Sequence, residues 1–187
     1  MASDKKRKYF RRKVGMVFRV PLGEDLYGYG QIANETEEIF FDYVDNAKNV
    51  NIGNLLNHKV IFKIVVQNGP LHDGIWEVLG LYPVVEQNAT RKDRFNYDFM
   101  KERYVIVKED MTEVPSTPEE IRKLGLECFA AWHYTNVEDR LRDHFAGRKN
   151  YWIESFLNSH NPDFPDIETF YRNQGYNYVW EGDNNED

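Results

Sequence analysis

The sequence predicts an α+β fold, in which a curled, mostly antiparallel β-sheet or half-open barrel of about six to seven strands precedes short C-terminal helices. Two observations predict this class. In the first half, short alternating segments are separated by turns, and few links are long enough for the crossover helices that parallel strands need. After Pro115 the pattern changes to short helices with clear start signals. Aromatic residues make up 15% of the chain and provide bulky side chains for a β-rich core.

Six segments have the alternation or the β-branched content of strands. They are 16–22, 26–32, 38–44, 59–66, 75–85 and 103–108. The segment 59–66 is rich in valine and isoleucine, so we expect it in the centre of the sheet. A short helix is expected at 51–57, and turn residues at 68–70 and 72–74 separate the fourth strand from the fifth.

The strongest helix signal begins at Thr117. Thr117 is placed to cap the first amides, Pro118 takes the first helical position and Glu120 completes a capping box. The helix is expected to be short, because Gly125 follows closely. The next segment, 127–134, fits a strand or a helix, and we favour a late strand that joins the sheet.

Three further helices are expected near the C-terminus. Asn136 is predicted to cap a helix over 137–146, and Asp166 to cap one over 167–174. The segment 151–158 also has a helical pattern.

These elements predict one core with two charged ends. The β-rich core is expected over 14–112, and a helix-rich part over 113–180 is expected to pack on the same core. A basic tail precedes them over 1–13, and an acidic, disordered tail follows over 181–187.

The chain has the features of a soluble cytoplasmic protein. Its one cysteine, Cys128, rules out an internal disulfide, which favours a reducing compartment. No apolar run is long enough to span a membrane, and the charged N-terminus lacks the apolar core of a secretory signal. We therefore expect no membrane association.

Charge is distributed unevenly around a net value of −7. Residues 1–13 hold seven Lys and Arg against one Asp, so the rest of the chain is strongly acidic. An acidic body repels nucleic-acid phosphates and favours basic partners. An alternative function is therefore a nucleic-acid-associated module that uses the basic tail.

The dinucleotide-binding pattern G-x-G-x-x-A is matched in residue spacing by Gly28-Tyr29-Gly30-Gln31-Ile32-Ala33. That motif needs a helix N-terminus facing the pyrophosphate, whereas acidic residues follow here and would oppose phosphate. We favour a strand in which Gly28 and Gly30 allow another element to approach closely. No cofactor is expected.

Titratable residues give no catalytic or metal signature. The histidines are His58, His72, His133, His144 and His160, and none forms a zinc motif with another histidine or with Cys128. Cys128 with His133 or His144 is conceivable as a nucleophile and its base, but a buried, small apolar role is favoured. We predict that the chain is not an enzyme, with a small enzyme of unrecognised site as an alternative.

Acidic and aromatic residues are interleaved between Glu35 and Asp45. The simpler interpretation is a strand with one solvated face, and we favour it. The functional interpretation is a patch that binds a basic protein surface, where aromatic side chains supply buried contacts. Its candidate partner-binding residues are Glu35, Glu37, Asp42 and Asp45.

The segments V-G-M-V-F-R-V-P-L-G from Val14 and L-Y-G-Y-G-Q-I from Leu26 resemble a known family. They are similar to the opening of the immunity protein 26 family, whose members typically begin with a G-D-x-F-x-I-P-L strand and a Y-x-Y-G-Q strand. Met16 stands where that family usually has Asp. The resemblance extends over about 14–110, and the C-terminal helices lie outside it.

The resemblance implies a bacterial immunity protein of a polymorphic toxin system, acting in interbacterial competition. Such a protein binds and neutralises a cognate toxin protein in the cytoplasm without catalysis. The resemblance brings no catalytic residues and assigns no oligomeric state. The matching positions are interpreted as fold-making residues, namely Gly15, Pro21, Tyr27, Tyr29, Gly30 and Gln31.

Overall fold

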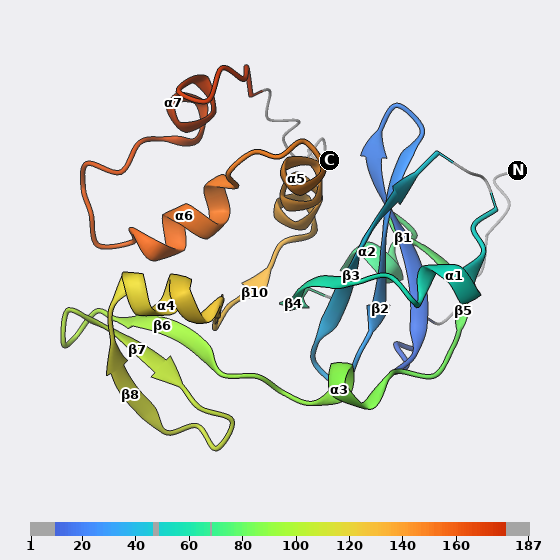
Figure 1. The fold of residues 1–187 in the computed structure, drawn as a ribbon, viewed down its shortest axis with the longest axis horizontal. Helices are drawn as coiled ribbons and strands as arrows, with labels where there is room; N and C mark the ends of the chain where they lie inside the picture. The colour runs from blue at the N-terminus through green and yellow to red at the C-terminus, as the bar shows by residue number, and fades with distance from the viewer. Residues whose placement is uncertain (1–9, 47–48, 68, 179–187) are drawn as a thin grey trace, which may run out of the picture.

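The computed structural model describes residues 10–46, 49–67 and 69–178. Within these residues the strands form two sheets and no closed barrel, with a six-stranded sheet in the order β10-β4-β3-β2-β1-β5 and a four-stranded sheet in the order β8-β7-β6-β9 (Figure 1). The predicted α+β class with C-terminal helices is confirmed. The second sheet was not anticipated. Most of the basic tail and all of the acidic tail lie outside the described residues.

The large sheet contains five of the six predicted strands, whereas the sixth, 103–108, lies in the small sheet. The strands of the large sheet are β1 (Met16–Gly23), β2 (Leu26–Ile32), β3 (Glu38–Asp45), β4 (Val60–Val66), β5 (Glu77–Leu81) and β10 (Ala131–Trp132). All neighbours pair antiparallel except β10, which lies parallel to β4 at the sheet edge. The sheet is therefore mostly antiparallel, as predicted.

Both faces of the large sheet are buried. On one face Phe18 stacks on Trp76 with ring centroids 5.3 Å apart, and this core extends to α5 (Tyr134–Phe145). On the other face, Tyr29 and neighbouring apolar side chains pack against α1 (Ile52–Leu55). Because both faces are covered over β1, β2 and the first half of β3, these strands are largely apolar on both sides, whereas the edge strand β5 is partly exposed.

The small sheet consists of β6 (Arg94–Asp98), β7 (Arg103–Val107), β8 (Glu113–Ser116) and β9 (Glu127–Cys128). One face carries a core of its own that includes Phe95, Tyr104 and Ile121. Ile121 lies on α4 (Pro118–Leu124), which packs on this sheet. The segment predicted as one late strand is split, because β9 joins the small sheet and β10 the large one.

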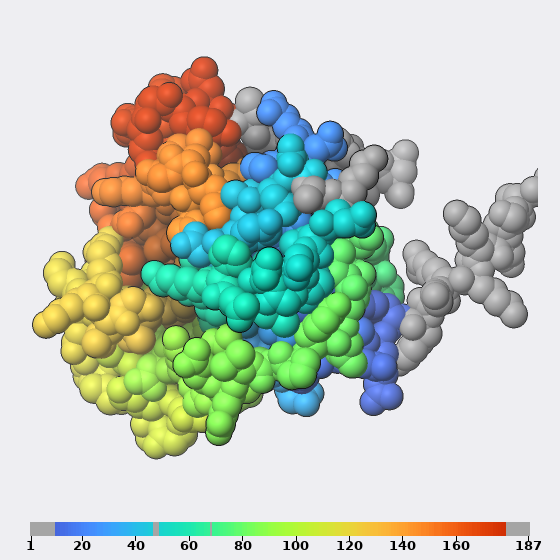
Figure 2. Space-filling view, turned by 45° about the vertical axis from the view of Figure 1, so that its right-hand side comes forward, coloured from blue at the N-terminus to red at the C-terminus, as the bar shows by residue number. Residues whose placement is uncertain are grey.

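A long connection with the short helix α3 (Glu86–Ala89) links the two sheets (Figure 1). In the space-filling view the small-sheet region with α4, in yellow, and the C-terminal helices, in orange to red, lie side by side along one flank of the large sheet (Figure 2). Those helices are α5, α6 (Tyr151–Leu157) and α7 (Ile167–Arg172).

Two of the three predicted helix caps are confirmed. Thr117 accepts from the Glu120 amide and Asp166 accepts from the Thr169 amide, as expected. The predicted Asn136 cap is wrong: α5 begins at Tyr134, and the Asn136 side chain accepts from the Thr135 hydroxyl instead. The turn signal near residue 69 proved to be the short helix α2 (Gly69–His72).

The two glycines of β2 allow close approach, which confirms the strand interpretation of the G-x-G-x-x-A pattern. A Cβ at Gly28 would lie 3.2 Å from Leu141 Cδ1 of α5. A Cβ at Gly30 would lie 2.6 Å from the Phe18 ring and 2.8 Å from the Ile39 carbonyl oxygen. The Phe18 ring can therefore lie across β2 only because Gly30 has no side chain.

We predict that Gly30→Ala lowers the free energy of unfolding by about 1–3 kcal/mol, because its methyl group meets backbone and a buried ring. Gly28→Ala is the matched comparison and should cost less, since its nearest neighbours are the flexible ends of leucine side chains. Chemical denaturation of both variants measures the difference. Equal losses would contradict the packing described here.

Glu38 places a carboxylate in the interior beside β4. It is 2% exposed, and it accepts from the Arg12 guanidinium at 2.6 Å and from the Val66 amide at 3.0 Å. Burial raises the pKa of Glu38 to about 7, although Arg12 opposes the shift. Between that pH and the ordinary glutamate pKa of about 4.3, Glu38 is protonated in the native state but has lost its proton in the unfolded chain.

The contribution of Glu38 to stability should therefore increase as the pH falls from 8 to 5.5, by about 2 kcal/mol. Glu38→Gln removes the titrating carboxyl group. The increase in the free energy of unfolding between pH 8 and 5.5 should therefore be smaller by that amount in the variant. Denaturation of both proteins at the two pH values isolates this effect from that of other buried acids. If the variant kept the same pH dependence of stability, the pKa of Glu38 would lie outside this pH range.

Candidate partner-binding groove

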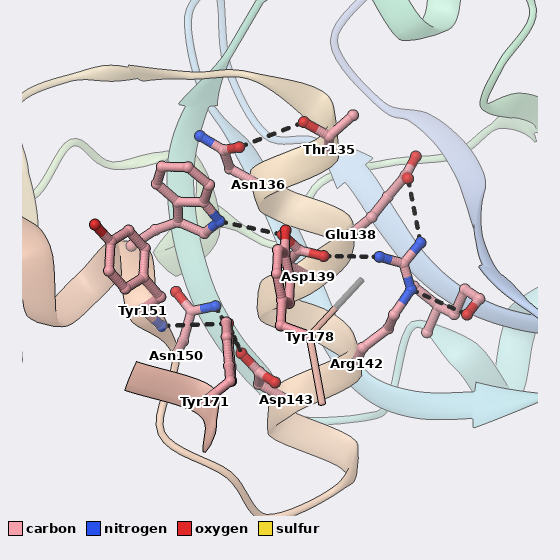
Figure 3. A network of polar contacts seen from close by, with 12 residues as sticks. Thr135, Asn136, Glu138, Asp139, Arg142, Asp143, Asn150, Tyr151, Tyr171 and Tyr178 are labelled. Carbon is pink, nitrogen blue, oxygen red and sulfur yellow. Dashed lines mark hydrogen bonds and ion pairs between the residues drawn. The ribbon is translucent and has the colours of Figure 1, made fainter. Parts of the chain in front are cut away.

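A groove of about 530 Å³ lies between the β1–β2 hairpin and α5. The hairpin contributes Leu22, Gly23, Glu24 and Leu26. The facing wall consists of four α5 residues and of residues 176–178. Figure 3 shows the α5 residues together with Tyr178.

The hairpin wall ends in a tight turn that points acidic side chains outward. Gly23, Glu24 and Asp25 all have positive φ values, of 94°, 48° and 61°. Glycine adopts this backbone readily, and Asp tolerates it better than most residues do. Glu24 and Asp25 are exposed, and Leu26 beside them is 38% exposed. The hairpin tip therefore presents two carboxylates beside an apolar side chain.

Arg142 joins the two walls of the groove. Its Nε donates to the Leu22 carbonyl at 3.0 Å, and its Nη1 donates to Asp139 at 2.9 Å (Figure 3). Its third nitrogen, Nη2, lies 3.5 Å from Glu138. Because all three nitrogens have partners, Arg142 holds the hairpin against α5 instead of offering a free positive charge.

Two α5 acids line the groove, and aromatic donors fix their position. Glu138 accepts from the Trp76 indole at 2.9 Å. Asp139 accepts from the Trp152 indole at 3.2 Å and from the Tyr178 hydroxyl at 2.8 Å. Burial raises the pKa of Glu138, while the Trp76 and Arg142 contacts oppose that shift.

Asp143, one turn further along α5, connects the C-terminal helices to it. It accepts from the Tyr171 hydroxyl at 2.7 Å and from the Asn150 amide at 2.9 Å (Figure 3). It also accepts from Arg148 at 3.0 Å. The Tyr171 ring stacks on that of Tyr178 at 4.8 Å. This contact places Tyr178 at the groove wall.

The groove is negatively charged. Glu24, Glu138 and Asp139 face one arginine, which their own wall and the hairpin already engage. Such a surface can bind a basic segment of a partner through charge-assisted hydrogen bonds.

The four predicted partner-binding acids do not form one patch. Glu35 is exposed in the β2–β3 connection, and Glu37 beside it is buried against Arg94 and Lys63. Asp42 and Asp45 lie toward the opposite end of β3.

These two acids also have internal partners. Asp42 is exposed and lies 2.8 Å from the His144 ring of α5. Asp45 accepts from the Tyr29 and Tyr43 hydroxyls, which belong to the opposite face of the sheet. Their role in binding a partner stays a prediction, and Glu37 is enclosed within the fold.

Among the described residues, Cys128 and the two histidines considered with it have separate contacts. Cys128 is buried, and burial raises the pKa of its thiol to about 12. His133 bonds Thr135, and His144 pairs with Asp42. In the described part of the chain, no group of three His, Cys, Asp or Glu residues is placed to hold a metal ion.

The residues of the family-like motif act within the sheet. Gln31 is buried and donates to the Tyr82 carbonyl at 3.0 Å, next to Gly15, whose φ is +90°. A Cβ at Gly15 would lie 2.4 Å from that same carbonyl oxygen. Pro21 pairs with Tyr27 across the hairpin. These contacts fix the register of β1 and β2 beside the residues that follow β5.

The family to which this sheet belongs is indicated by sequence comparison. The sequence model of immunity protein 26 matches residues 13–105. Residues 13–105 belong to the immunity protein 26 family. No curated protein and no solved structure matches the chain. Among the described residues, none of the helices combines the length and apolar character needed to cross a bilayer.

The immunity protein 26 segment provides only one wall of the groove. It includes the β1–β2 hairpin with Glu24 and Leu26, and it ends within β7. The wall with Glu138 and Asp139 lies outside the segment. Sequence reasoning did not single out these acids. Glu138 and Asp139 lie four and three residues before Arg142 in a helical pattern. This spacing could have indicated their contact with Arg142, since such residues share a helix face.

We predict that Tyr171→Phe lowers the free energy of unfolding by about 1–3 kcal/mol, because Asp143 stays buried and loses one donor. Tyr151→Phe is the matched control, since within the described residues the Tyr151 hydroxyl makes no hydrogen bond. Chemical denaturation measures both. Equal effects would rule out the Asp143 contact as the stabilising one.

Proposed function

We propose that this protein is a bacterial immunity protein that binds a cognate toxin domain in the cytoplasm and neutralises it without catalysis. The observation that carries the proposal is the immunity protein 26 match over residues 13–105. The buried, protonated state of Cys128 is compatible with a non-catalytic role. Binding would work by occlusion of the toxin's active surface.

The charge of the chain supports the proposal that the toxin has a basic surface. The net charge is −7 although residues 1–13 are strongly basic, so the folded body is acidic. A toxin that acts on nucleic acid needs a basic surface to hold phosphates. An acidic inhibitor matches that surface, gains a faster encounter, and competes directly with the nucleic acid.

The hairpin groove is the proposed contact surface for the toxin. Glu24 and Asp25 at its rim are exposed and would meet basic side chains first. Leu26 supplies an apolar contact between them and the groove. Asp42 and Asp45, near the same end of the sheet, are proposed as flanking contacts.

The function is tested with the toxin domain encoded beside this gene, expressed in a sensitive bacterium with and without this protein. Protection and a stable one-to-one complex are expected. If the neighbouring domain is not toxic, or if its toxicity is unrelieved, the immunity function is wrong.

The contact surface is tested separately with the double variant Glu24→Lys and Asp25→Lys. We expect its affinity for the toxin to fall at least about tenfold, mainly through slower association at low salt, because exposed rim charges control encounter. The control is Glu102→Lys with Glu113→Lys, which makes the same charge change at exposed positions of the small sheet. Surface plasmon resonance measures the rates. Protection with equal affinities would keep the function and reject the groove.

A further inference from the structure

A second hollow, the inter-sheet pocket, lies where the two sheets meet. It has a volume of about 300 Å³. The large sheet contributes Val65 of β4, and the small sheet contributes Val107 of β7 and Arg94 of β6. Phe129, which follows β9 and is 51% exposed, closes one side. This volume is at the lower end of the range for small-molecule sites.

Arg94, one of the residues that line this pocket, has an unsatisfied buried donor. Its side chain is 7% exposed, and its Nη2 pairs with Glu37. Its Nη1 is one of two buried side-chain polar atoms in the described residues that have no hydrogen-bond partner. A buried guanidinium nitrogen without a partner is costly, so an acceptor that reached it would be stabilised.

The charges around Arg94 leave the pocket positive. Glu37 is buried and forms ion pairs with two buried cations. One carboxylate oxygen lies 3.2 Å from Lys63, and the other contacts Arg94. Burial alone would raise the pKa of Glu37, but donors from Asn34 and Arg94 outweigh it and lower that pKa. Glu37 therefore stays charged and neutralises only one of the two.

Two further cations lie at the pocket and are free to act. Arg91 and Lys92 line it, are exposed, and make no ion pair or hydrogen bond within the described part of the chain. The positive charge is local, because the whole chain carries −7. An anion is thus attracted to this pocket and repelled by most of the remaining surface.

Apolar groups supply most of the remaining lining, to which Thr36, Lys108 and Glu109 add polar and charged groups of both signs. The apolar groups belong to Val65, Val107, Met111, Cys128 and Phe129. A small pocket with apolar walls and one buried donor suits a single small anionic head joined to an apolar body, whereas a polyanion such as a nucleic acid would leave its other charges against apolar walls.

We propose that the inter-sheet pocket binds a carboxylate that carries an apolar group. The carboxylate lies toward Arg94, Arg91 and Lys92, and the apolar group lies against Val107 and Phe129. Two sources share this chemistry, a free carboxylic acid and the C-terminal carboxylate of a peptide that ends in an apolar residue. The site is separate from the hairpin groove and does not depend on the immunity function.

The first test is titration of the full chain with 3-phenylpropionate and, as the uncharged control, 3-phenylpropanol, followed by isothermal calorimetry and by amide NMR shifts. Millimolar or tighter binding is expected for the acid, with the alcohol weaker by about tenfold or more, because the charged head adds a charge-assisted hydrogen bond. The shifts should centre on Arg94, Val107 and Phe129. Equal binding of both probes, or no binding, would overturn the proposal.

Variants then test the cations directly. The double variant Arg91→Gln and Lys92→Gln removes two exposed charges and should weaken binding of the acid about three- to tenfold. The matched control, Lys123→Gln with Lys149→Gln, removes exposed charges away from the pocket and should leave binding unchanged. Equal loss in both pairs would show a general charge effect and reject the site.

Arg94→Lys tests the buried donor. A lysine keeps a cation for Glu37 but removes Nη1, so binding of the acid should fall about tenfold or more while thermal unfolding shows a folded protein. Unchanged binding would reject the role of Arg94. If this variant does not fold, the pair of probes and the double variant of Arg91 and Lys92 still decide the proposal.

The source of the carboxylate is decided with N-acetyl-Gly-Phe, which has a free C-terminal carboxylate, and its C-terminal amide. Binding of this acid but not of the amide, as tight as that of 3-phenylpropionate, supports a peptide C-terminus. Binding of 3-phenylpropionate alone supports a free acid. Binding of the amide as well as the acid would contradict a carboxylate site.

Discussion

Leu141 of α5 rests on Gly28 of β2, and the arrangement of the C-terminal half depends on this contact. A Cβ at Gly28 would lie 3.2 Å from a methyl group of Leu141, so the glycine lets the helix approach the sheet closely. The approach brings Arg142 to the Leu22 carbonyl and Glu138 to the Trp76 indole. The hairpin groove, and the aromatic donors that shape its acids, follow from that placement.

The opposite end of the large sheet is held by buried charge. Lys63 donates to the carbonyls of Asn88 and Thr90, and it pairs with Glu37, which also contacts Arg94 of the small sheet. These contacts fix the connection between the sheets. Buried ion pairs cost desolvation, so their benefit here is a defined orientation more than added stability. The same cluster leaves the unsatisfied nitrogen on which the inter-sheet pocket is argued.

The two proposed sites use these constraints differently. The hairpin groove is open, acidic and lined by exposed turn residues such as Glu24, which suits a macromolecular partner. The inter-sheet pocket is smaller and mostly apolar, with Arg94 at its wall, which suits a small ligand group. One wall of the groove comes from the immunity protein 26 segment, and the facing wall comes from α5 beyond it.

The sequence by itself determined what depends on neighbouring residues. Alternation over 26–32 and 38–44 predicted β2 and β3, and the caps at Thr117 and Asp166 predicted α4 and α7, because these signals act within one turn or one strand. The glycine spacing of β2 predicted close approach, though not by which helix.

Only the tertiary structure decided which residues meet across the chain. It placed Glu37 inside against Arg94, separated it from Asp42 at the far end of β3, and joined the short strands β6 and β9 into a second sheet. It also brought α5 to the hairpin, which created the acidic groove. Local pattern could not reveal these pairings, because burial and charge pairing depend on contacts between residues far apart in the sequence.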